Sequence, residues 1–277
     1  MGTGLRSGTV KHSLGNSVKI NSVVKLRIGD KEIEIHDDPP TDAFFNDLYA
    51  ELYASEPSPV LQSIGMMRII DVTGESACDI SGSSLMLSAT FDQVTASGTC
   101  TYNSYEAPST IRLYASDTNV PYFEIAFPSG ISVQTGLPVS VTWYGSIYIS
   151  PGPTSGYLAG ADLFPFYINR DIASVLAGRR GSIILTLQYV EMIGISGTQT
   201  NVSILPKTQL TRDPTTRRAY LQPTKVITSG EIQFIYVYAY YGSQYVPYFR
   251  WNPNPFLTVS ANDYVSLDIS SFTSVTY

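Results

Sequence analysis

The chain has 277 residues, a formal net charge of −6 and only 14% charged residues. Its longest basic runs are the pairs Arg179–Arg180 and Arg217–Arg218, so we expect no direct contact with nucleic acid, which requires clustered positive charge. No apolar run approaches the roughly 20 residues of a membrane-spanning helix, which predicts a chain without a membrane span.

An N-terminal segment over residues 1–59 has three predicted parts. Residues 1–15 are rich in Gly, Ser and Thr, as is typical of a mobile arm. Apolar residues alternate over 24–28 and again over 33–35, on either side of a Gly-Asp-Lys turn, which predicts a β-hairpin. Acidic residues, prolines and Thr41 as an N-cap then indicate a helix over 37–54.

Aromatic residues line one side of this predicted helix. Phe44, Phe45, Tyr49 and Tyr53 recur at helical spacing, with two leucines on the same side. Such a stripe either packs on a sheet of its own chain or serves as a docking surface for a neighbouring subunit. We therefore take these four residues as candidate interface residues.

Residues 60–150 are expected to form a first β-unit. Gly, Pro, Ser and Asn separate its predicted strands, and this short spacing is typical of a sandwich rather than a parallel α/β sheet. The predicted strands are Met66–Val72, Ser84–Phe91, Thr110–Tyr114, Tyr122–Phe127, Ile131–Gln134 and Val139–Ile149.

A connector over 151–180 and a second β-unit over 181–277 complete the predicted organisation. The connector contains a short helix over 169–178 that ends at Gly178, a suitable C-cap. In the second unit we expect strands over 183–195, 232–241 and 265–269, and an exposed loop over 211–218. The predicted fold is mainly β, with two antiparallel β-sandwich (jelly-roll-like) units, a short N-terminal helix and a short connecting helix.

The two units share a sequence pattern. Placing Val120–Phe123 over Val246–Phe249 and continuing without a gap sets Val139 on Val265 and Ser140 on Ser266. The alternation of apolar and polar residues stays in phase across the match. Because a slip of one residue exchanges the buried and exposed faces of a strand, this phase indicates a duplicated β-unit.

Residues with catalytic chemistry are few. The only histidines are His12 and His36, neither in a metal-binding spacing, and the chain contains no GxSxG, no P-loop and no GxGxxG after a strand. Asp37, Asp38 and Asp42 could supply oxygen ligands to Ca²⁺, but capping of the predicted helix explains them. We therefore predict a protein that is not an enzyme and that has no cofactor and no metal site.

Cys78 and Cys100 are the only cysteines, and both are expected near strand ends of the first unit. In an extracellular protein they could form a disulfide. Two buried free thiols are equally consistent with the sequence.

Aromatic residues of the second unit form the other candidate interface. Tyr236, Tyr238 and Tyr240 alternate along one predicted strand, with Tyr248 and Trp251 close in sequence. Tyr and Trp combine a large contact area with a polar edge, which suits a protein interface or a sugar-binding platform. The alternative is an ordinary aromatic ladder between two sheets.

Four segments carry a likeness to known proteins: Asp37–Ala54, Leu85–Phe91, Ile111–Ala115 and Ile131–Trp143. Their layout resembles virion structural proteins of tailed phages and archaeal viruses, particularly tail, fibre, turret and spike components. The resemblance covers about the first 150 residues, with an echo at 257–269, although the usual single β-unit of such proteins is here followed by a second one.

This resemblance implies a virion structural protein, in a capsid, spike or tail, that is made in the host cytoplasm and assembles with itself and other virion subunits. A host surface receptor or glycan is a further candidate partner. Two other functions remain open: an extracellular filament subunit assembled by strand exchange, with the segment before Ile20 as donor, and a carbohydrate-binding adhesin module.

Overall fold

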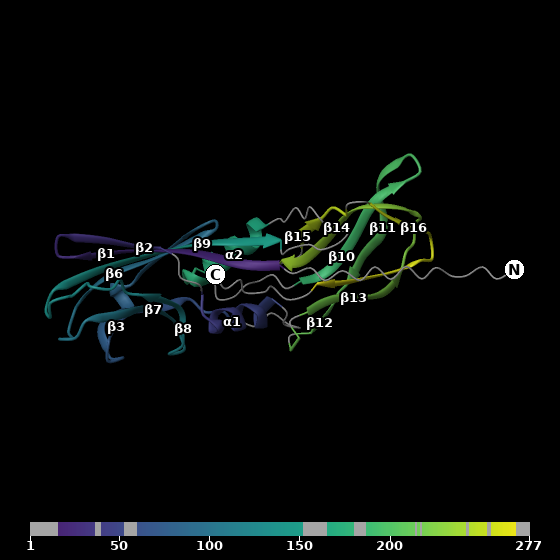
Figure 1. Ribbon diagram of the computed structural model, residues 1–277. Helices are drawn as coiled ribbons and strands as arrows, with labels where there is room; N and C mark the ends of the chain where they lie inside the picture. Colours follow the sequence, from purple (N-terminus) through teal and green to yellow (C-terminus); the bar gives the residue numbers. More distant parts are fainter. Residues whose placement is uncertain are drawn as a thin grey trace.

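A computed structural model describes residues 16–36, 40–52, 60–151, 165–179, 187–213, 215–216, 218–241, 244–253 and 256–269. These residues form four antiparallel sheets and two α-helices. The chain is therefore mainly β, as its sequence predicts. Figure 1 shows an elongated molecule, with the N-terminal strands at one end and the C-terminal strands at the other.

The first half of the chain contains two sheets. Sheet 1 has the strand order β2-β1-β9-β6-β5, and sheet 2 has the order β4-β3-β7-β8. Their elements are β1 (Asn16–Ile28), β2 (Lys31–His36), α1 (Asp42–Leu52), β3 (Ile64–Asp71), β4 (Ser76–Ser81), the short 3-10 helix Gly82–Ser84, β5 (Met86–Thr90), β6 (Gln93–Thr101), β7 (Pro108–Ala115), β8 (Pro121–Ala126) and β9 (Pro138–Pro151).

The second half contains the other two sheets. Sheet 3 has the order β11-β10-β14-β15, with β16 also paired to β14, and sheet 4 has the order β12-β13-β17. Their elements are α2 (Pro165–Leu176), β10 (Leu187–Ser196), β11 (Gln199–Gln209), β12 (Thr211–Asp213), β13 (Arg218–Lys225), β14 (Gly230–Tyr241), β15 (Gln244–Trp251), β16 (Leu257–Val259) and β17 (Tyr264–Ile269).

Sheets 1 and 2 face each other across a shared core. Alternate residues of β9 are buried, and one of them, Trp143, packs against Phe123 of sheet 2 with 4.6 Å between ring centroids. The indole N–H of Trp143 donates to the buried Ser22 Oγ at 3.1 Å, so its polar atom is satisfied inside the core. The ring also lies over Gly145, where any Cβ would overlap it.

The hairpin β1–β2 is part of sheet 1. Along its whole length, from Asn16 to Ile28, β1 pairs with β9, from Pro151 back to Val139. The hairpin register sets Leu26 opposite Ile33 and Lys25 opposite Glu34, as the alternation in the sequence predicts. The segment that precedes the first predicted β-unit thus supplies two of the strands of that unit.

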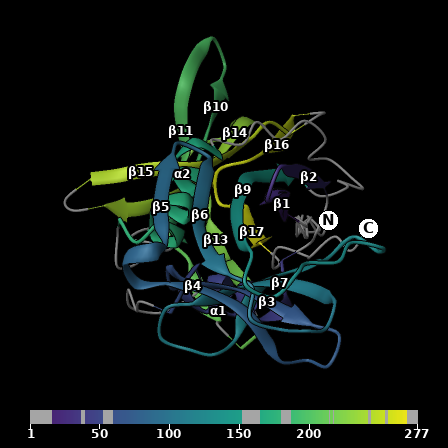
Figure 2. The same ribbon diagram turned by 90° about the vertical axis from the view of Figure 1, so that its left-hand side faces the viewer.

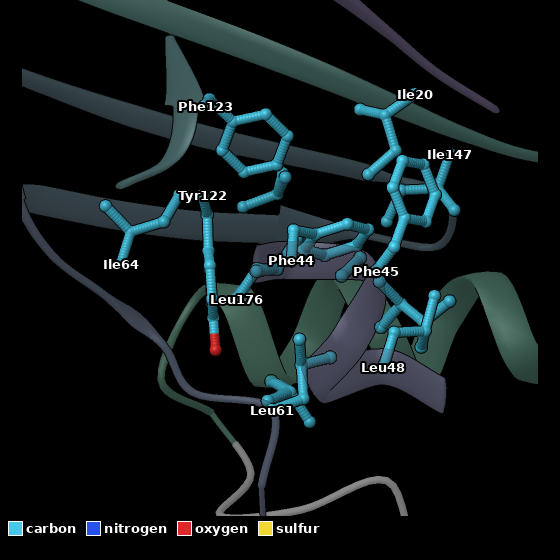
Figure 3. Packing of buried hydrophobic residues seen from close by; sticks show 14 of the residues in the cluster. Ile20, Phe44, Phe45, Leu48, Leu61, Ile64, Tyr122, Phe123, Ile147 and Leu176 are labelled. Atoms are coloured by element: carbon cyan, nitrogen blue, oxygen red, sulfur yellow. The ribbon is translucent and has the colours of Figure 1, made fainter. Parts of the chain in front are cut away.

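Phe44 and Phe45 of α1 face the core of their own chain. Phe44 and Phe45 are 0% and 6% exposed, and Phe44 contacts Tyr122 and Phe123 of β8, as Figure 3 shows. These two residues therefore do not form a docking surface. The side chain of Tyr49 and all of Tyr53 lie outside the described residues.

Polar contacts fix the position of α1. The hydroxyl of the buried Tyr122 donates to Asp47 Oδ2 at 2.6 Å, and the buried Glu51 accepts the backbone N–H of Leu61 at 2.9 Å. The Thr41 hydroxyl donates to the carbonyl of Pro121 at 2.6 Å, which ties the start of the helix to β8. Asp37 and Asp38 lie outside the described residues.

The second helix joins the two halves. α2 contacts β5, β6 and β9 of sheet 1 and also β15 of sheet 3, and Figure 2 shows it between these strands. Gly178, at φ +68°, ends the helix as predicted. The buried apolar residues of both halves belong to one contiguous cluster. The two β-units are thus packed together through α2 and not only linked by the chain.

Strand pairing repeats from one half to the other. In sheet 2, Leu113 pairs with Phe123 and Tyr114 with Pro121, with a bulge between the two pairs. In sheet 3, Val237 pairs with Phe249 and Tyr238 with Pro247, again with a bulge between them. The pairing of β3 with β7 and of β10 with β14 matches in the same way, including the bulges at both ends.

The turn before the last strand of each unit is also repeated. Gly136 and Asn262 both have positive φ, and the N–H of the next residue donates to the carbonyl of Gln134 or Ser260. In each unit the last strand then pairs with an equivalent strand, β9 with β6 and β17 with β13. The two units therefore share one backbone plan, in agreement with the repeat in the sequence.

Two local predictions are wrong. Residues 131–134 are not a strand, whereas the equivalent segment in the second unit is β16. In the first unit, the carbonyl of Glu106, which precedes β7, accepts the Tyr102 hydroxyl at 2.7 Å. In the second unit, the equivalent residue, Gly230, instead pairs with Val259 of β16. The predicted loop over 211–218 contains the short strand β12, which pairs with β13.

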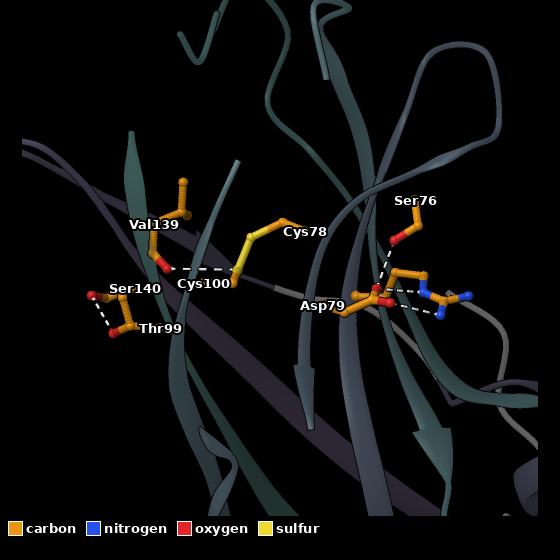
Figure 4. Close-up of a disulfide and its surroundings, with 8 residues drawn as sticks. Ser76, Cys78, Asp79, Thr99, Cys100, Val139 and Ser140 are labelled. Carbon is orange, nitrogen blue, oxygen red and sulfur yellow. Dashed lines mark hydrogen bonds and ion pairs between the residues drawn. A yellow bond between two sulfur atoms is a disulfide. The ribbon is translucent and has the colours of Figure 1, made fainter. Parts of the chain in front are cut away.

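A disulfide between Cys78 of β4 and Cys100 of β6 links sheet 2 to sheet 1, with 5.8 Å between the Cα atoms (Figure 4). Because it closes a loop of sequence separation 22, the chain-entropy argument gives a stabilisation of roughly 3 kcal/mol.

We expect the double variant Cys78→Ala, Cys100→Ala to lose about that much free energy of unfolding in urea titrations. Reductant should destabilise the parent chain and leave the double variant unchanged; a parent chain insensitive to reductant would contradict the assignment.

Candidate functional site

The candidate site is a row of aromatic side chains on the outer face of sheet 3. In β14, Ile235, Val237 and Ala239 are buried in the core, so the alternate residues lie on the opposite face. On that face the rings of Phe234, Tyr236 and Tyr238 follow one another, with centroids 6.1 and 6.0 Å apart. We call these three residues the aromatic stripe.

Neighbouring strands hold the stripe in place. The Tyr238 hydroxyl donates to Glu191 Oε2 of β10 at 2.7 Å, and Lys207 Nζ of β11 lies 4.5 Å from the centre of the same ring. On the other side, the Arg250 guanidinium of β15 lies 5.4 Å from the Phe234 ring. Burial and the Glu191 carboxylate both raise the pKa of Tyr238, which keeps its hydroxyl protonated as a donor.

The stripe is more accessible at its centre than at its framed end. Tyr238, under Lys207 and Glu191, is only 9% exposed, while Tyr236 and Phe234 are half-buried. Tyr236 thus presents a ring whose orientation is restricted by its neighbours. A restricted ring loses little conformational entropy when a partner covers it.

The equivalent face of the first unit has different chemistry. There Arg68 and Asp79 form an ion pair at 2.6 Å, and Arg112 and Glu124 form another at 2.9 Å. By the repeated register, Arg68 corresponds to Glu191, and Arg112 corresponds to Tyr236. The same backbone plan therefore carries Arg112 in an ion pair in the first unit and Tyr236 of the aromatic stripe in the second, while Glu191 keeps a charge at the position of Arg68.

The structure brings together part of the predicted aromatic cluster. Tyr236 and Tyr238 lie on one face of β14, as their spacing predicts. Tyr240, Tyr248 and Trp251 lie in β14 or β15, but their side chains are outside the described part of the chain.

Sequence reasoning missed Phe234, Lys207 and Arg250. Phe234 could have been found, because it stands two residues before Tyr236 and continues the same alternation. The two basic residues come from β11 and β15, so only the pairing of the strands places them beside the rings.

A second polar cluster surrounds Asp71, which is 4% exposed at the end of β3. Its carboxylate accepts the hydroxyls of Thr73 at 2.6 Å and Ser104 at 2.7 Å, and the N–H groups of Thr73 and Glu75 at 2.9 and 3.1 Å. These bonds lower the pKa of Asp71 to about 2. They close the turn between β3 and β4, so the carboxylate has a structural role.

Metal-ligand geometry is not seen in the described part of the chain, where no group of three or more His, Cys, Asp and Glu could hold an ion. His36 is exposed, with Nε2 at 2.9 Å from Glu34, and His12 lies outside the described residues. None of the helices that are described is long and apolar enough to cross a membrane.

Comparison with known proteins gives no relative for this chain, because no protein-family model, curated protein or solved structure matches it.

Acid should weaken the fold through Asp71. Its pKa is lowered on folding, so its contribution to stability is complete above the unfolded value of 3.8 and is lost as the pH falls towards about 2. We expect Asp71→Asn to be less stable than the parent chain at pH 7 and to lose less stability between pH 4 and pH 2. Urea midpoints across this range provide the measurement, with Asp117→Asn, a change at an exposed loop position, as the control. Parallel pH profiles for parent and Asp71→Asn would contradict the role of Asp71.

Proposed function

We propose that this chain is a structural subunit of a virus particle and that it assembles with copies of itself and with other virion subunits. The observation that carries the proposal is the aromatic stripe on the outer face of sheet 3. In this proposal the chain is synthesised in the host cytoplasm and becomes extracellular when the virus particle is released.

The stripe has the composition of the centre of a protein interface. Such centres are enriched in Tyr, Phe and Arg and depleted of Lys and Glu, and their most important residues are rings held in place by close packing. Tyr236 and Phe234 are half-buried, and Arg250 lies against Phe234. Lys207 and Glu191 stand at the Tyr238 end, where they form a polar border.

The contrast between the two units supports an interface on sheet 3. On sheet 2, the outer charges satisfy one another in two ion pairs, an arrangement that suits a face in contact with water. On sheet 3, the position of Arg112 holds Tyr236, and a partner that removes the apolar area of this ring and of Phe234 from water lowers the free energy. A weakly charged, tyrosine-rich chain built from two similar β-units fits a role in assembly.

Sugar binding is a second candidate function, because the stripe offers ring faces with hydroxyl groups. Tyr238 already uses its hydroxyl for Glu191, while the ring of Tyr236 is accessible enough to stack on a sugar. A glycan ligand would make the chain a receptor-binding component rather than a lattice subunit.

We expect Tyr236→Ser to weaken self-association about tenfold or more, the effect of truncating a ring at the centre of an interface. Sedimentation velocity of the purified chain over a concentration series measures this effect. The matched control is Tyr105→Ser, because Tyr105 is 93% exposed in a loop of the first unit. A chain that stays monomeric at every concentration, or equal losses in the two variants, would contradict the interface.

Electron microscopy of the associated fractions, with mass spectrometry of purified virus particles that encode the chain, tests its place in a virion. Closed shells, rings or spikes together with detection in particles are the expected result. A monomer that binds glycans in an array screen, with binding lost in Tyr236→Ser, would instead favour the sugar-binding function.

A further inference from the structure

Three strands carry Ser followed by Val or Leu at positions that the repeat superimposes. These serines are Ser17 in β1, Ser140 in β9 and Ser266 in β17. β9 and β17 are also equivalent in structure. Each follows the same turn, and β9 pairs with β6 as β17 pairs with β13.

The neighbours of β9 and β17 differ. β9 lies inside sheet 1, with β6 on one side and β1 on the other. β17 has β13 on one side, and among the described residues no strand pairs with its other edge. In the described part of the chain, sheet 4 thus corresponds to sheet 1 without the pair β1–β2.

The internal repeat also explains why no described strand lies at the second edge of β17. Offsetting the sequence against itself so that α1 matches α2 and β3 matches β10 also aligns Asn16 with Val139 and Ile28 with Pro151. The second-unit equivalent of β1 is therefore β9 itself. β9 is already held between β1 and β6, so it is not free to cover β17 as β1 covers β9.

The edge of β17 that lies away from β13 is called its open edge, because no described strand pairs with it. The N–H of Val226 donates to the carbonyl of Asp263 at 2.8 Å, just before β17 begins. Because the direction of hydrogen bonding alternates along an antiparallel strand, Val265 and Leu267 bond towards β13. The N–H and C=O groups of Tyr264 and Ser266 then point to the open edge, which is a ready template for another strand.

We propose that a strand from a second copy of this chain adds to the open edge of β17, antiparallel to it, in the position that β1 has beside β9. The inference rests on the self-assembly proposed above and specifies one of its contacts. Val265 and Leu267 are buried on the inner side of β17, so the added strand needs apolar side chains at alternate positions on that side.

The test compares proline at two equivalent serines. In Ser266→Pro the lost N–H faces the open edge, so the monomer should keep its unfolding midpoint while association falls at least tenfold. In Ser140→Pro the lost N–H faces β1, so the monomer itself should be destabilised. Ser140→Ala is the control that removes only the hydrogen bond between the Thr99 and Ser140 hydroxyls, 2.9 Å apart, and keeps the backbone N–H. Ser266→Lys, which blocks the edge with a charge and keeps the N–H, serves if the proline variant does not fold.

Amide hydrogen exchange gives an independent readout. The amide of Ser266 should exchange quickly in the monomer and slowly in the assembled state, while that of Leu267 should be protected in both. Equal destabilisation of the monomer by Ser266→Pro and Ser140→Pro, or a slow Ser266 amide in the monomer, would overturn the proposal by showing that the chain covers its own edge.

The two proposals fail in different ways. If Tyr236→Ser abolishes association and Ser266→Pro and Ser266→Lys leave it unchanged, the stripe is the subunit contact and strand addition at β17 is wrong. If the parent chain never associates, both self-assembly and strand addition are wrong.

Discussion

The position of β9 between β1 and β6 is the constraint on which the rest of the structure depends. Its alternate residues Val139, Val141, Trp143 and Ile147 are buried, so a slip by one residue on either side would expose Trp143 and break its bond to Ser22. β9 also ends the first unit and stands at the place of a first strand for the second. A single long strand thus completes sheet 1, while β17 of sheet 4 has one neighbour fewer among the described strands.

The two units keep one backbone plan and differ in the side chains that the plan leaves free. Register, bulges and the turn at Gly136 or Asn262 are shared, because the inner residues of both units must pack in a core. The disulfide is not shared: by register, Leu205 stands at the place of Cys78, and Thr224 at that of Cys100. Outer faces and covalent links have therefore diverged where packing did not constrain them.

Local alternation made much of the fold predictable, including the β1–β2 hairpin, most strands and the phase of the repeat. Features set by distant residues were not predictable, because pairing of β1 with β9 joins segments far apart in the sequence. The Thr41 hydroxyl donates to Pro121, which is distant in the sequence, and residues 131–134 are not a strand, whereas the equivalent segment of the second unit pairs with β14. At the candidate site, spacing identified Tyr236 and Tyr238, while only strand pairing brought Lys207 and Arg250 to the rings.

The stripe and the β17 edge belong to different sheets, so a copy can use both at once. In the proposed assembly, the stripe on sheet 3 binds by burying apolar area, whereas the edge of sheet 4 binds by backbone hydrogen bonds. If the two contacts relate a copy to different neighbours, association does not end at a closed dimer but continues into an array, whose closure depends on the angle between the contacts. Two different contacts per copy, one on a sheet face and one on a sheet edge, are therefore sufficient to build a shell or a filament from identical copies.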